Sequence, residues 1–162
     1  MHPVVRLLVG VARWVGIGLF AVLTVTLFWS VTIRYFAIFG GSLPWVEEFA
    51  RFTFIWMAFL GAIVALDRGQ HIAIDLLAKT LPASVQRMLA AAVNVVILAF
   101  LAVYTVKGAE LVRLTTDQLS PQLSLPMSAI HLAVPVSGII MFLQVLTAYG
   151  RRQRVPWAAP TE

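Results

Sequence analysis

Four stretches of the chain are apolar and free of Asp, Glu, Lys, Arg and His. They cover residues 14–33, 52–66, 88–106 and 132–150. A helix rises about 1.5 Å per residue, so roughly 20 apolar residues cross the hydrocarbon layer of a bilayer, which is about 30 Å thick. Three of the stretches have that length, and the pattern therefore predicts at least three membrane-spanning helices.

The second stretch is shorter, and the residues before it complete a fourth span. Residues 45–51 continue a helical pattern backwards, which gives 22 residues from Trp45 to Leu66. We therefore predict an all-α integral membrane protein with a single membrane domain over residues 1–162. Its four spans are expected at about 12–33, 45–66, 86–107 and 127–149.

Composition favours a membrane environment and excludes several kinds of chemistry. Hydrophobic residues make up 60% of the chain and charged residues 12%, against roughly 25% charged in soluble domains. There is no cysteine, which excludes disulfides, thiolate metal sites and thiol catalysis. The net charge of +5 comes from basic residues scattered in ones and twos, so a nucleic-acid partner is not expected and membrane lipids are.

The distribution of lysine and arginine predicts the orientation of the helices. With the amino terminus in the cytoplasm, eight basic residues fall on the cytoplasmic side and four on the opposite side. Basic residues favour cytoplasmic loops, so we expect both termini in the cytoplasm. The first apolar stretch exceeds the core of a signal peptide and no small-residue cleavage site follows it, which favours a retained helix.

Some segments are expected to lie along the membrane surface or to extend beyond it. Asp67–Lys79 has a polar start and then apolar positions, which suits a short interfacial amphipathic segment on the cytoplasmic side. A helix from Pro82 to near Thr115 would be longer than the hydrocarbon layer is thick, so it must tilt or protrude. In the fourth span, Pro135 removes the donor for the His131 carbonyl, and we expect a kink there.

The interiors of the spans contain no ionisable group that would carry an ion or a proton across the membrane. Asn94 and Gln144 are the amides at membrane depth, and we interpret both as hydrogen-bonding groups between helices. His71 and His131 are expected on opposite sides of the membrane, so they cannot ligate the same haem or metal. We therefore expect no cofactor, no metal and no substrate-binding residue in this chain.

Glu47 and Glu48 have two interpretations. They lie in the early turns of the second span, after Pro44, where the helix dipole favours carboxylates, and Arg51 is spaced to pair with either of them. Alternatively, they make a polar contact with a partner at the outer face of the membrane. Adjacent side chains diverge on a helix, so the two glutamates are not expected to form a catalytic pair.

Four short motifs follow one another along the chain. They are Trp45-x-Glu47-Glu48-x-x-Arg51, Trp56-Met-Ala-Phe-Leu-Gly-Ala, Arg68-Gly-Gln-His71-Ile-Ala-Ile-Asp75, and Ser120-Pro121-x-Leu-x-Leu-Pro-Met followed by Ala133-Val-Pro135. In this order and spacing they resemble the small permease subunit of tripartite ATP-independent periplasmic (TRAP) transporters. The resemblance extends from about Arg34 to Tyr149.

The resemblance implies a multi-pass protein of the bacterial inner membrane that is not an enzyme. It implies a small subunit of a sodium-coupled transporter, which imports an organic acid delivered by a periplasmic binding protein. The chain would then belong to the static scaffold beside a large polytopic permease subunit. The motif residues become candidate partner contacts, namely Trp45, Glu47, Glu48, Arg51, Trp56, Arg68, His71, Asp75, Ser120 and Pro121.

Three other classes of protein remain open at this point. A stand-alone four-helix exporter would need an intramembrane acid, which the spans lack. A haem or quinone enzyme would need ligands that face each other within the membrane. An assembly factor unrelated to transport would have no large permease as its partner.

Overall fold

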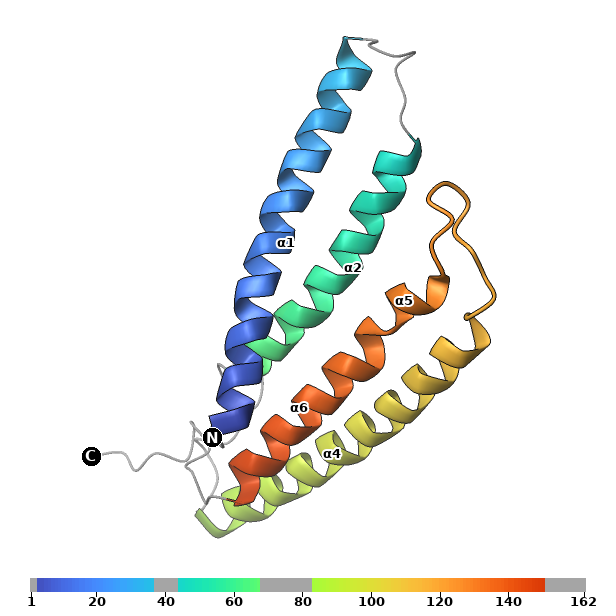
Figure 1. Ribbon diagram of the computed structural model, residues 1–162. Coiled ribbons are helices and arrows are strands. Elements are labelled where there is room, and N and C mark those ends of the chain that lie inside the picture. The colour runs from blue at the N-terminus through green and yellow to red at the C-terminus, as the bar shows by residue number, and fades with distance from the viewer. Residues whose placement is uncertain (1–2, 37–43, 68–82, 151–162) are drawn as a thin grey trace, which may run out of the picture.

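The computed structural model describes residues 3–36, 44–67 and 83–150, and this part of the chain is almost entirely helical (Figure 1). Its elements are α1 (Pro3–Tyr35), α2 (Pro44–Asp67), α4 (Ala83–Leu114), α5 (Met127–His131) and α6 (Ala133–Gly150). Extended pairing in these residues is limited to one isolated bridge between Leu119 and Pro126.

Four helical segments are long and apolar enough to cross a membrane. They are Pro3–Tyr35, Pro44–Asp67, Ala91–Leu114 and Met127–Thr147. The prediction of an all-α membrane protein with four spans is therefore confirmed.

Two of the helices are longer than a bilayer requires. With 33 residues α1 extends about 50 Å, and the 32 residues of α4 extend nearly as far. As expected, α4 runs without interruption through Gly108 to Leu114. Both helices must tilt in the membrane or protrude from it.

The fourth span is interrupted where the sequence predicts a kink. The short α5 ends at His131, and α6 begins at Ala133, with Leu132 between them. Pro135 has no amide hydrogen to donate to the His131 carbonyl, so the regular ladder of helical hydrogen bonds fails at this turn.

The helices form two antiparallel pairs. Figure 1 shows α1 beside α2 and α4 beside α6, with α2 and α6 as the neighbours that join the pairs. The start of α1 lies near the later turns of α6, and at the opposite end of the bundle the α4–α5 loop lies beside the start of α2.

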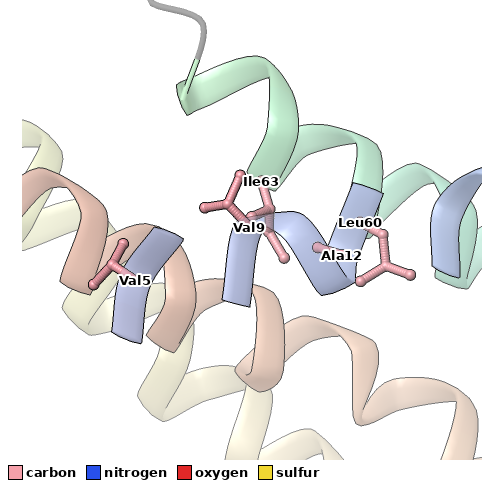
Figure 2. Close-up of a cluster of buried hydrophobic side chains, with 5 residues drawn as sticks. All are labelled: Val5, Val9, Ala12, Leu60 and Ile63. Carbon is pink, nitrogen blue, oxygen red and sulfur yellow. The ribbon is translucent and has the colours of Figure 1, made fainter. Parts of the chain in front are cut away.

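The pairs meet in a cluster of buried aliphatic side chains, which we call the apolar joint (Figure 2). It consists of Val5, Val9 and Ala12 from α1 and Leu60 and Ile63 from α2. Three α6 residues, Ile140, Met141 and Leu143, pack against this cluster together with Leu19. Lipid tails are as apolar as these side chains, so close packing rather than escape from water must hold them together.

Within the second pair, two glycines allow α4 and α6 to approach closely. A methyl group added at Gly108 would lie 2.7 Å from Val134 Cγ1 and 3.1 Å from Pro135 Cδ. A methyl group at Gly138 would overlap the Thr105 side chain and lie 2.9 Å from Tyr104 Cδ1. Small residues at such crossings are a common means of packing helices in membranes.

Candidate functional site

The first turns of α2 carry the first sequence motif, and its side chains differ in exposure. The Glu48 side chain is buried, with 7% of its surface exposed, alongside Val46 and Ala50. Trp45, Glu47 and Arg51 are exposed. The motif therefore has one residue that faces the protein interior and three that face outward.

The α4–α5 loop folds back beside this end of α2. The Met127 amide donates to the Gln118 carbonyl at 2.8 Å, and the Ser120 amide donates to the Leu125 carbonyl at 2.9 Å. Ser120 is buried, and its hydroxyl oxygen accepts the Leu125 amide at 3.2 Å. These contacts close a compact hairpin over residues 118–127.

The tip of this hairpin is a single helical turn that begins at Ser120. The Ser124 amide donates to the Ser120 carbonyl at 3.1 Å, and Pro121 occupies the first position of the turn. Proline suits that position because its missing donor would have no partner there. The next amides, of Gln122 and Leu123, are donors that the turn itself cannot satisfy.

Glu48 satisfies both of these amides. Its Oε2 atom accepts the Gln122 and Leu123 amides at 2.9 Å each, across 74 and 75 residues of sequence. Amide donors at the start of a helical turn attract a carboxylate, and hydrogen bonds to a charged group are stronger than those between neutral groups. We call this contact between α2 and the loop the polar joint, comprising Glu48, Gln122 and Leu123.

The structure bears on the structural interpretation of the glutamates, whereas their contact with a partner stays a prediction. Glu47 lies in the first turn of α2, where the helix dipole favours it. The ion pair with Arg51 is not formed: within the described ranges, the only ion pair joins Lys107 to Glu110. Glu48 bonds the loop backbone instead, and no pattern in the sequence indicated that partner.

Other buried polar groups also bond within the chain. Gln144 Nε2 donates to the Ile63 carbonyl at 3.1 Å, which confirms the prediction that Gln144 joins helices. The Tyr104 and Ser137 hydroxyls lie 3.4 Å apart, and Thr115 Oγ1 lies 3.0 Å from His131 Nδ1. Asn94 is half-buried on α4, and its predicted contact stays a prediction.

The remaining motif residues fall in different places. Trp56 is half-buried on α2, and Pro121 is exposed at the tip of the loop. Arg68, His71 and Asp75 lie outside the described residues, as does nearly all of the expected amphipathic segment Asp67–Lys79. Among the residues that are described, no three His, Cys, Asp or Glu side chains gather as a metal site would require.

The fold and the site thus define a small multi-pass membrane protein whose buried polar groups mainly connect its own helices and loop. Residues 23–155 match the family of tripartite ATP-independent periplasmic transporters, DctQ component. The chain belongs to this family, and the resemblance of its motifs to the TRAP small permease subunit is confirmed.

Three relatives illustrate the family. The isethionate TRAP transporter permease protein DctMQ of Oleidesulfovibrio alaskensis is 30% identical over 150 residues, 89% of this chain and 24% of that protein. The C4-dicarboxylate TRAP transporter small permease protein DctQ of Rhodobacter capsulatus is 31% identical, over 75% of this chain and 56% of its own length. The sialic acid TRAP transporter small permease protein SiaQ of Vibrio cholerae is 24% identical, over 82% and 75% respectively.

Membership in this family establishes the general role of the chain. It is a component of a TRAP transporter and a multi-pass protein of the bacterial inner membrane. Members of this family are transporter subunits and not enzymes.

Proposed function

We propose that this chain is a static subunit that supports a large permease subunit without binding the transported solute itself. The observation that carries this proposal is the use of its buried polar groups. Gln144, Ser137, Thr115 and Glu48 bond to other parts of the same chain. A carrier would instead need polar groups at membrane depth that are available to a solute.

The transport system that we propose imports an organic acid with sodium as the coupling ion. A periplasmic binding protein would deliver the acid, and the large permease subunit would hold the solute and sodium sites. Relatives named for isethionate, C4-dicarboxylates and sialic acid support an organic acid as the class of substrate. The individual acid would be selected by the partner proteins.

We further propose that both termini are cytoplasmic, as the lysine and arginine distribution predicts. The α4–α5 loop and the start of α2 then face the periplasm. In this orientation Trp45, Glu47, Arg51 and Pro121, all exposed, are available to partner proteins at that side. Arg68, His71 and Asp75 would face the cytoplasm, and Trp56 lies between these two levels.

Purification of the tagged chain from its native membranes in mild detergent tests the scaffold proposal. We expect one large polytopic protein to co-purify in a stoichiometric amount, identified by mass. A chain that purifies alone would contradict the proposal. If liposomes containing only this chain then moved a solute, the alternative of a stand-alone exporter would replace it.

A further inference from the structure

We propose that Glu48 is a positioning residue that holds the α4–α5 loop in the shape required to dock the periplasmic binding protein. The inference rests on the proposed function for the identity of that partner. The role of Glu48 within the chain rests on the geometry of the polar joint alone.

Within the described residues, the hydrogen bonds between the loop and α2 all involve one side chain, that of Glu48. The hydrogen bonds inside the hairpin, from Met127 to Gln118 and from Ser120 to Leu125, fix its own shape. They do not attach it to the first helix pair. The two amides that bond Glu48 Oε2 provide that attachment, at 2.9 Å each.

The attached loop exposes apolar side chains beside polar ones. Leu119 and Leu125 are 64% and 45% exposed, and Pro121 and Gln122 are exposed beside them. The loop follows Leu114, the last residue of the third candidate span, so it lies beyond the hydrophobic part of α4. Apolar side chains on a loop whose backbone is already hydrogen-bonded offer a preorganised contact patch, which lowers the entropy lost on binding.

Amide hydrogen exchange tests the positioning role directly. The complex of this chain with its large subunit is reconstituted in nanodiscs as wild type, Glu48→Ala, Glu48→Gln and Glu47→Gln. In Glu48→Ala we expect the Gln122 and Leu123 amides to exchange at least about tenfold faster, because opening of the loop no longer breaks two bonds to a charged acceptor. Glu48→Gln keeps an acceptor oxygen and should be intermediate. Glu47→Gln removes an exposed neighbouring carboxylate and should leave these amides unchanged.

Binding of the solute-loaded binding protein to the same nanodiscs tests the docking role. We expect the dissociation constant to rise about tenfold in Glu48→Ala, with the large subunit still co-purifying in the wild-type amount. A merely structural role of Glu48 in α2 would instead accelerate exchange along α2 or reduce co-purification.

The possible results separate the two parts of the proposal. Unchanged exchange at Gln122 and Leu123 in Glu48→Ala would overturn the positioning role. Faster exchange with unchanged binding would overturn the docking role of the loop. If the wild-type complex fails to form, the proposed function itself fails, whereas the exchange measured on the isolated chain still decides the role of Glu48.

Discussion

The two joints between the helix pairs are built from different interactions. The apolar joint packs aliphatic side chains from the first turns of α1 and the last turns of α2 together and against α6. The polar joint connects α2 to a loop through a carboxylate and two backbone amides. In lipid, close packing must provide the attraction between helices, because apolar side chains are solvated as well by hydrocarbon chains as by other side chains. Beyond the spans, backbone amides without partners are available, and one glutamate can satisfy two of them.

The apolar joint also contains a polar group at its edge. Gln144 bonds the carbonyl of Ile63, a residue of the joint that is 0% exposed. Its Oε1 atom is buried and has no hydrogen-bond partner in the described part of the chain. We therefore expect the loss of unfolding free energy to differ according to whether an aliphatic side chain, a carboxylate or an amide is removed.

Replacement of Ile63 by alanine should have the largest effect on stability. The cavity left at a fully buried site cannot be filled by lipid, and we expect a loss of about 2–3 kcal/mol of unfolding free energy. Thermal or SDS-induced unfolding in detergent measures this change. Val25→Ala, at a position that is 67% exposed on α1, removes less volume from a lipid-facing site and should change stability by under about 0.5 kcal/mol. Equal losses in the two variants would show that the joint is not tightly packed.

The polar joint should lose about 1–2 kcal/mol in Glu48→Ala, and about 1 kcal/mol in Ser120→Ala. Because Ser120 and Glu48 hold the same turn, the double variant should lose less than the sum of the two single losses. Strict additivity would mean that the two side chains hold the loop independently. The same unfolding assay measures all three variants.

Combining Glu48→Ala with Ile63→Ala tests whether the two joints are independent. The residues lie 15 positions apart on α2, about 22 Å along the helix, so the losses should add to within about 0.5 kcal/mol. A coupling larger than about 1 kcal/mol would show that the two joints form one cooperative unit.

The sequence predicted the spans and the features that depend on local chemistry. Runs free of charge marked the four membrane-spanning helices, and Pro135 marked the break between α5 and α6. Gln144 was identified as a contact between helices because an amide at membrane depth needs a partner. Each of these inferences uses a property of one segment, which is why each could be made without knowing its neighbours.

The polar joint could not be predicted in the same way. The partners of Glu48 are backbone amides, which carry no residue-specific signature, and they lie 74 and 75 residues away. Arg51 offered a local partner of opposite charge three residues away, yet it is exposed and these two described side chains form no ion pair. The face of α1 that packs against other helices could not be predicted either. Val9 is buried and Val11 is exposed, although both are valines, because an apolar side chain suits a lipid-facing position as well as a packed one. The motifs contained Glu48 and Ser120, but only the fold brings them together.

Gln144→Leu should change stability by less than about 0.6 kcal/mol. The variant loses one hydrogen bond to the Ile63 carbonyl, but it also removes a buried oxygen that lacks a partner, and leucine keeps most of the volume. Gln144→Ala leaves a cavity in the same place and should lose about 2 kcal/mol. If both variants lost equally, the hydrogen bond rather than packing would determine stability at this edge of the apolar joint.

A small gain in stability is expected from a substitution at Ser124, at the tip of the loop. Its backbone has a φ of 52°, in the left-handed region where glycine is favoured. Ser124→Gly removes this strain but adds flexibility to the unfolded chain, so we expect a gain of about 0.5 kcal/mol or less. Ser124→Val places a β-branched side chain in the same conformation and should lose about 1 kcal/mol. The Gln122 and Leu123 amides should exchange more slowly in Ser124→Gly and faster in Ser124→Val, with the apolar joint unaffected. Equal exchange in the glycine and valine variants would show that residue 124 can leave the left-handed region without a cost in free energy. It would also show that the polar joint does not constrain this backbone conformation.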